Sequence, residues 1–310
     1  MKRIILNDDL DKDNLLIKYF ITLACNNRCP YCFMLPQLDN TLKFNNEIFD
    51  LFKEKFNEYV LEHPNKVTLE LLGGDPLFIK EIDRLNELNL ENTNVIFYSN
   101  LNFKPNLLKK KLEVFKFDFK IYVSIHLVSN LNYLKENIIY LQKINKLKEC
   151  IFVLDESSLK IFDEFLLFFK ENNIPYVLEL IRKDVDIVTS DYIKDIFYNH
   201  YKETKSNFKI NNNYFTETEI VKYDLFNIAK YFYISCQTNE IEIDYYGNIN
   251  MVCSHPYTSH IKYGFKIKPL MCHKETCDCC YKQYKEIIRP KLKPNNNEQN
   301  IINFVLNKGN

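Results

Sequence analysis

Three cysteines stand close together near the start of the 310-residue chain, in the stretch ACNNRCPYCF at 24–33. Cys25, Cys29 and Cys32 lie in one segment, where Pro30 disfavours a continuing helix, so the sequence predicts a loop. Thiolate is the ligand that soft metals and iron–sulfur clusters require. A tetrahedral zinc site and a common 4Fe–4S cluster each take four protein ligands. Three thiols in one loop therefore predict either zinc with a distant fourth ligand or a cluster with one open iron.

Six further cysteines gather in the last third of the chain: Cys236, Cys253, Cys272, Cys277, Cys279 and Cys280. The chain shows no signal peptide and no apolar run long enough to span a bilayer, so we expect a soluble, cytoplasmic protein. In a reducing compartment, ten cysteines favour metal ligation over disulfides. Structural zinc is the alternative for this second set. Cys150 begins an apolar run and is predicted to be a small buried hydrophobic residue.

Apolar runs rich in β-branched and aromatic residues recur along the first 180 positions, and each predicts a strand. They are 15–24, 66–72, 94–99, 120–125, 150–154 and 175–180. The segments between them, such as 45–63 and 131–146, show helical periodicity. Strand–helix repeats of this kind form βαβ units. The sequence therefore predicts an α/β fold, a partial (β/α)6 TIM-like barrel.

Polar or chemically active residues stand at the end of each predicted strand, in the order Cys25, Cys29 and Cys32; Gly73, Gly74, Asp75 and Pro76; Ser99 and Asn100; His126; Asp155; Arg182 and Lys183. The carboxyl ends of parallel strands form the active face in such folds. The chain contains only five glycines, so two adjacent ones indicate a backbone geometry that requires them. We therefore predict a single site at this edge.

The rest of the chain divides into shorter segments. Residues 1–14 form a lead-in to the barrel of 15–185, and 186–230 are expected to be a connecting helical segment, with helices around 191–203 and 217–230. A small α+β, cysteine-rich domain is predicted for 231–290, with a β-hairpin that turns at 246–248. The tail is 291–310.

The loop CNNRCPYC resembles the cluster-binding loop of the radical SAM superfamily, with Tyr31 in the aromatic position. GGDP resembles that family's glycine-rich motif, with Asp75 in place of the usual glutamate. The resemblance implies that the three loop cysteines hold a 4Fe–4S cluster with an open iron, and that the glycine-rich motif binds the amino group of S-adenosylmethionine (SAM). Ser99, Asn100 and Ser124 are implied to contact its ribose or carboxylate. The reduced cluster would then cleave SAM to a 5′-deoxyadenosyl radical, which abstracts a hydrogen atom from the substrate.

The second cysteine set resembles the C-terminal extension called SPASM or, when shortened, twitch. Cys236 and Gly247 fit its pattern, and Cys253 follows one residue later than usual. Six cysteines rather than seven imply one auxiliary 4Fe–4S cluster, with Cys236 and Cys253 as ligands. Which of Cys272, Cys277, Cys279 and Cys280 complete the set stays open.

The resemblance implies an oxidoreductase or maturase that modifies a peptide or protein side chain. A dehydrogenase or epimerase acting on a sugar, nucleoside or aminoglycoside is the alternative, because about 14 residues before the first strand leave no room for a leader-peptide-binding module. A non-catalytic metal-binding protein is the third possibility. His126 either faces the substrate as a catalytic residue or is hydrogen-bonded to its neighbours. We expect a low-potential electron donor such as flavodoxin or ferredoxin. A net charge of zero favours neither nucleic acid nor a membrane as partner.

Overall fold

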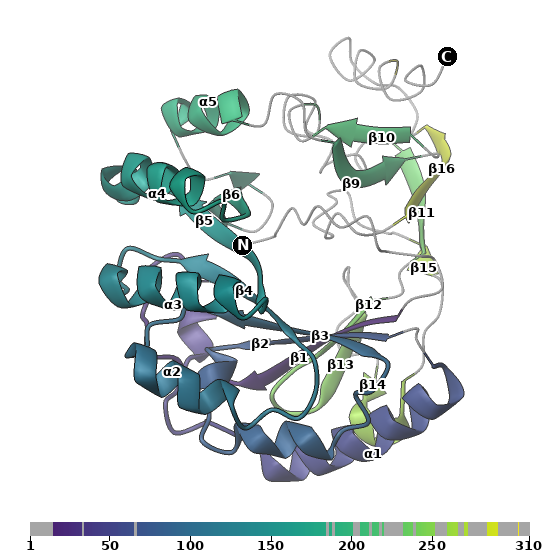
Figure 1. Ribbon diagram of the computed structural model, residues 1–310. Helices are drawn as coiled ribbons and strands as arrows, with labels where there is room; N and C mark the ends of the chain where they lie inside the picture. Colours follow the sequence, from purple (N-terminus) through teal and green to yellow (C-terminus); the bar gives the residue numbers. More distant parts are fainter. Residues whose placement is uncertain are drawn as a thin grey trace.

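The computed structural model describes residues 15–32, 34–64, 67–183, 186–187, 190–200, 205–210, 213–216, 219, 232–237, 240–251, 259–265, 270–271, 284–290 and 303. Their largest unit is a nine-stranded sheet in the order β14-β13-β12-β1-β2-β3-β4-β5-β6. The strands from β1 to β6 are parallel, and the sheet curves without closing (Figure 1). The predicted partial barrel is therefore confirmed.

The six parallel strands coincide with the six apolar runs: β1 (Leu15–Thr22), β2 (Val67–Gly73), β3 (Thr93–Ser99), β4 (Lys120–Ile125), β5 (Leu147–Leu154) and β6 (Tyr176–Leu180). Alternate residues of β1 point toward the helices, since Tyr19 stacks on Phe52 with ring centroids 4.4 Å apart. The other residues, including Phe20, point toward the concave face. Each strand therefore presents one face to the core and one to the barrel interior.

Helices cover the outer face of this sheet (Figure 1). They are α1 (Asn46–Glu62), α2 (Pro105–Leu112), α3 (Leu131–Lys143) and α4 (Leu159–Glu171), with short 3-10 turns η1 (Leu35–Gln37), η2 (Pro76–Phe78) and η3 (Ile82–Glu87). The Asn45 side chain caps α1 by accepting the Ile48 backbone N–H. Phe49, Phe52 and Phe56 of α1 are fully buried at helical spacing, so their burial fixes the helix on the sheet.

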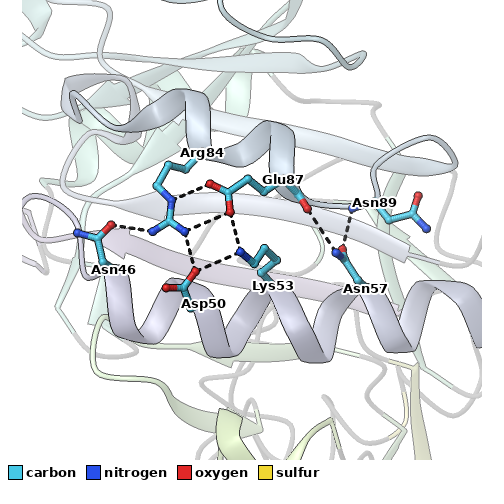
Figure 2. Close-up of polar contacts among 7 residues, drawn as sticks. All are labelled: Asn46, Asp50, Lys53, Asn57, Arg84, Glu87 and Asn89. Atoms are coloured by element: carbon cyan, nitrogen blue, oxygen red, sulfur yellow. Dashed lines mark hydrogen bonds and ion pairs between the residues drawn. The ribbon is translucent and has the colours of Figure 1, made fainter.

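A polar network on the surface joins α1 to η3, the turn that follows the glycine-rich motif (Figure 2). The Arg84 guanidinium donates to Asp50 at 2.6 Å and to Glu87 at 2.8 Å. Lys53 also contacts Glu87, at 2.6 Å, and Asn57 donates to the Glu87 carbonyl oxygen. Exposed pairs contribute little one by one, but a shared network with a bidentate arginine contributes more. The connection after β2 is thereby held against the first helix.

The hairpin predicted to turn at 246–248 is present, formed by β12 (Glu240–Ile243) and β13 (Asn248–Met251). Gly247 lies in its turn with φ +84°, the left-handed region that favours glycine. This hairpin is part of the barrel sheet, because β12 pairs in parallel with β1, from Leu16 opposite Glu240 to Tyr19 opposite Ile243. β14 (Ser259–His260) forms the sheet edge beyond β13, before η5 (Ile261–Tyr263).

The segment between the barrel and the hairpin contains strands as well as helix. α5 (Asp191–His200) confirms the helix predicted around 191–203, while the one predicted around 217–230 lies outside the described residues apart from Glu219. β7 (Arg182–Lys183) pairs with β8 (Asp186–Ile187). A separate five-stranded sheet contains β9 (Lys205–Ile210), β10 (Asn213–Thr216), β11 (Phe232–Gln237), β15 (Leu270–Met271) and β16 (Tyr284–Pro290). Within the described part of the chain, no helix has the length and apolarity needed to cross a membrane.

Candidate functional site

A cavity of about 190 Å³ lies at the carboxyl ends of the parallel strands. Most of the residues predicted for the site line it: Cys25, Cys29, Tyr31, Cys32, Gly73, Gly74, Ser99, Asn100, Ser124 and His126. Glu179, at the end of β6, forms part of the same wall. Asp75 and Pro76 are buried behind the cavity rather than in its lining. The fold therefore brings the loop cysteines, the glycine-rich motif and the ends of β3 and β4 to one place.

The two glycines of the motif pack directly against the segment that leads into the cysteine loop. The Gly74 N–H donates to the Thr22 carbonyl at 2.9 Å, and the Asp75 N–H donates to the Ala24 carbonyl at 2.8 Å. A Cβ on Gly73 would lie 2.0 Å from the Thr22 oxygen, and one on Gly74 would lie 2.0 Å from the Ala24 oxygen. Only glycine permits this approach, which fixes the start of the cysteine loop against β2.

The buried Asp75 carboxylate joins the glycine-rich motif to the end of β3. It accepts the Leu77 N–H at 3.0 Å, the Asn100 N–H at 3.0 Å, and the Ser99 hydroxyl at 3.0 Å and 3.1 Å. Burial raises the pKa of Asp75 to about 6, although these hydrogen bonds act in the opposite direction. The Ser99 hydroxyl in turn accepts the Leu101 N–H at 3.1 Å. Asp75 and Ser99 thus fix the backbone that forms the cavity wall through buried hydrogen bonds.

A set of asparagines ties the cysteine loop to the loops after β3 and β4. Asn100 donates to the Asn26 side chain at 2.9 Å, and Asn26 donates to the Asn102 carbonyl at 2.8 Å. Asn102 donates to the Asn27 side chain at 2.8 Å, and Asn27 donates to the Ser129 hydroxyl at 2.9 Å. We call these five residues the asparagine network. The network connects the cysteine loop to the loops that follow two neighbouring strands, β3 and β4.

The three loop thiols are shielded from solvent, with Cys25 and Cys29 buried and Cys32 partly exposed. Burial raises the pKa of Cys25 to about 11 and that of Cys29 to about 12, and it also raises the pKa of Cys32. Such thiols become thiolates when a positively charged metal group is bound beside them. Among the described residues, no three His, Cys, Asp or Glu side chains converge closely enough to hold a single metal ion.

Tyr31 and His126 meet at the opening of the cysteine loop. The Tyr31 hydroxyl lies 2.9 Å from Nδ1 of His126, and the two ring centroids are 5.8 Å apart. Burial lowers the pKa of His126 to about 4, so its imidazole is neutral at pH 7. His126 is thus hydrogen-bonded to a neighbour, as one of its two alternatives expected, and it also lines the cavity, while its catalytic role stays a prediction.

A second cavity, of about 720 Å³, lies on the other side of the cysteine loop. It is lined by the segment from Met34 to Leu42 and by the β12–β13 hairpin, including Asp244 and Tyr245. Phe20 and Leu38 line both cavities. The cysteine loop therefore lies between the 190 Å³ cavity and the 720 Å³ cavity.

The remaining predicted ligands are not placed by side chain. Cys236 lies on β11, where only the backbone is described, and Cys253, Cys272, Cys277, Cys279 and Cys280 lie outside the described residues. Cys150 is buried inside β5 and does not line the cavity, which confirms that it is a core residue. Asp155 accepts hydrogen bonds from Ser157 and Ser158 at the start of α4, so its carboxylate is engaged locally.

No family model matches the chain, and no curated protein matches its sequence. Among solved structures, the chain is similar to Streptococcus suis SuiB bound to S-adenosylmethionine, with 16% identity and a TM-score of 0.53 over 77% of this chain and 60% of SuiB. A second structure of SuiB gives a TM-score of 0.48 with the same identity and coverage. Native anSMEcpe with bound AdoMet and Cp18Cys peptide gives 12% identity and a TM-score of 0.48 over 80% of this chain and 77% of that one.

The chain spans 60% of the length of SuiB, so the likeness concerns the fold of the part that the two share. In this chain, CNNRCPYC and GGDP meet at the carboxyl edge of the parallel strands. The protein therefore shares its partial-barrel fold with SuiB, and three thiols of a single loop lie at the carboxyl ends of its strands.

Proposed function

We propose that the protein is a radical SAM enzyme, with a 4Fe–4S cluster on Cys25, Cys29 and Cys32 and with SAM in the adjacent cavity. One observation carries this proposal. The three thiols line the same cavity as the glycine-rich motif, although about 40 residues of sequence separate the two. The fold shared with SuiB supports it, because SuiB was solved with S-adenosylmethionine bound.

The donor set fits an iron–sulfur cluster better than zinc. Three of the side chains that the cysteine loop contributes to the cavity are thiols, the ligand that iron–sulfur clusters require. A structural zinc site takes four protein ligands, whereas a cluster with one open iron needs only three thiolates, the number that the cysteine loop places in the cavity. A cubane spreads its thiolates over a wider span. When bound, it would supply the electron that reductively cleaves the sulfonium of SAM.

The chain's own residues would bind and orient the ligand. The Ser99 hydroxyl is engaged by Asp75 and Leu101, so its part is to support the cavity wall. Ser124 lines the cavity, and its hydroxyl, unlike that of Ser99, is not engaged by a neighbouring side chain of the described residues, so we assign it a direct contact with the ligand. His126, neutral at pH 7, would offer a ring nitrogen without adding charge next to a sulfonium.

The apolar part of the wall would exclude water. Phe20, Leu72 and Ile151 line the cavity opposite the cysteine loop. A carbon radical abstracts hydrogen from whatever donor is nearest, so a wall that admits only the substrate protects the reaction. We infer that the substrate is a peptide or protein side chain, oxidised with the help of an auxiliary cluster on Cys236, Cys253 and further C-terminal cysteines. This part rests on the resemblance of the second cysteine set.

The test compares two buried cysteines. The full chain is reconstituted anaerobically with iron and sulfide, and bound iron, sulfide, zinc and 5′-deoxyadenosine formed from SAM and dithionite are measured. Cys29→Ala should lose about four irons per chain and all SAM cleavage. Cys150→Ala removes an equally buried thiol that lies outside the cavity, and it should keep both. Zinc in place of iron in the unaltered protein, or full cleavage by Cys29→Ala, would contradict the proposal.

A further inference from the structure

The side-chain amide of Asn100 is held in one orientation directly beside the cysteine loop. Asn100 follows β3 and is buried. Its Oδ1 accepts the backbone N–H of Asn102 at 2.8 Å. Only the oxygen of an amide can accept a hydrogen bond, so this contact decides which way round the group lies. The Nδ2 group must therefore point toward the cysteine loop.

Both hydrogens of that Nδ2 group have acceptors in the loop. One is donated to Oδ1 of Asn26 at 2.9 Å, and the other to the sulfur of Cys25 at 3.5 Å. The same sulfur accepts the backbone N–H of Asn27 at 3.4 Å. Cys25 therefore accepts one hydrogen bond from the backbone of its own loop, at Asn27, and one from the side chain of Asn100, directly after β3.

The loop that carries Asn100 is braced from α3. Leu101 adopts φ +49°, a strained conformation for a residue other than glycine. Asn137, fully buried on α3, donates to the carbonyl oxygens of Leu101 at 3.0 Å and Phe103 at 2.9 Å. Its contacts hold the strained turn in place. The Asn100 amide is thus positioned in advance of any ligand and does not depend on one for its orientation.

We propose that Asn100 tunes the reduction potential of the cluster that Cys25 helps to hold, by donating this N–H to the Cys25 sulfur. The inference rests on the function proposed above. A one-electron reduction adds negative charge to the cluster and its sulfurs, and an N–H dipole directed at a sulfur stabilises that charge. Hydrogen bonds to charged groups are stronger than those to neutral ones, so the bond favours the reduced state. Asn100 therefore raises the potential and eases reduction by the electron donor.

Asn100→Leu and Asn100→Asp test this role in the full, anaerobically reconstituted chain. Leucine removes the donor, and aspartate keeps the acceptor for Asn102 but replaces the N–H with an oxygen. Asn102→Ala is the matched control, because it breaks the side-chain contacts with Asn27 and Asn130 and leaves the backbone N–H that orients Asn100. The readout is an EPR-monitored redox titration of the signal that changes when SAM is added, since only a cluster with an open iron responds to SAM.

Both Asn100 variants should lower the ratio of reduced to oxidised cluster at a fixed potential by about fivefold to tenfold, where tenfold corresponds to about 59 mV for one electron. Asn102→Ala should leave the ratio within about twofold of the unaltered protein. An unchanged potential in Asn100→Leu, an equal shift in the control, or failure of both Asn100 variants to assemble a cluster that the control assembles would each overturn the inference. If the unaltered chain binds no cluster, the proposed function itself fails, and that result is separate from these.

Discussion

Oδ2 of Asp75 accepts the backbone N–H of Asn100 at 3.0 Å. The glycine-rich motif and the end of β3 are thereby joined through one buried carboxylate. The same Asn100 contacts Cys25 with its side chain, so one residue connects the motif to the thiol loop. The geometry of the site is therefore set by contacts among the glycine-rich motif, the end of β3 and the cysteine loop, which lie far apart in the sequence. A substitution in any of them should alter the geometry of the other two.

The Asp75 carboxylate should make the stability of the protein depend on pH. Burial raises its pKa from 3.8 to about 6, so the folded state binds this proton more tightly than the unfolded state does. Its contribution is therefore fully present below about pH 4 and is lost as the pH rises through about 6, an effect of about 3 kcal/mol. Urea unfolding from pH 3.5 to 7.5 measures it, and Asp75→Asn should lack this fall. Parallel curves for both proteins would contradict the assignment.

Gly73→Ala should cost far more than Gly264→Ala. Both glycines have positive φ, +118° and +77°, so both substitutions bear the conformational penalty for alanine. Only at Gly73 would the new Cβ meet backbone, 2.0 Å from the Thr22 oxygen, whereas at Gly264 nothing lies within 4 Å. We expect an extra loss of about 1–3 kcal/mol in the free energy of unfolding at Gly73, measured in urea, together with reduced iron binding. Equal losses would show that the close approach to the cysteine loop is unimportant.

His126 should stay neutral across the physiological range. Its burial lowers the pKa from 6.5 to about 4. Because the folded state excludes the proton, the stability that this histidine contributes is present above about pH 6.5 and is lost as the pH falls through about 4. Imidazole ¹⁵N shifts from NMR, assigned by comparison with His126→Asn, should report no protonation between pH 5.5 and 8. A titration near 6.5 would place the side chain in solvent instead.

Glu87→Gln should weaken the network that joins α1 to η3 (Figure 2). Hydrogen bonds from Arg84 and Lys53 lower the pKa of Glu87 from 4.5 to about 2, so its contribution is present above about pH 4.5 and is lost as the pH falls through about 2. The group is surface-exposed, so we expect a loss of at most about 1 kcal/mol at pH 7, decreasing in high salt. Glu58→Gln, which breaks only a pair with Lys55, is the control and should cost less. An equal cost for both substitutions would mean that the network adds nothing.

The barrel was predictable because its strands are apolar runs and the segments between them show helical periodicity. Residues 15–24 and 120–125 needed only their own composition to be recognised as strands. The edge at which Cys25 and Gly73 meet followed from the rule that parallel strands carry their sites at the carboxyl ends. These inferences depend on residues that are near one another in the chain or on a general property of the fold.

Apart from Asn100, the asparagine network was not predictable, because asparagine is abundant in this chain and its positions carry no pattern. Asn27 and Asn102 differ from other loop asparagines only in the partners that the fold gives them. The only available signal was that each closely follows a predicted strand. The pairing of β12 with β1 could not be predicted for a related reason. Neither segment contains a local sequence signal that places Leu16 opposite Glu240.

The pairing of β12 with β1 also has a consequence during synthesis. The strand that leads into the cysteine loop is synthesised long before its second neighbour, which is complete only at residue 243. Until then, Leu16–Tyr19 expose an unpaired backbone edge beside a nascent thiol loop, a situation that favours association with other chains. Truncated chains that end before residue 240 should therefore need a chaperone, whereas released chains that extend past 251 can close the sheet themselves.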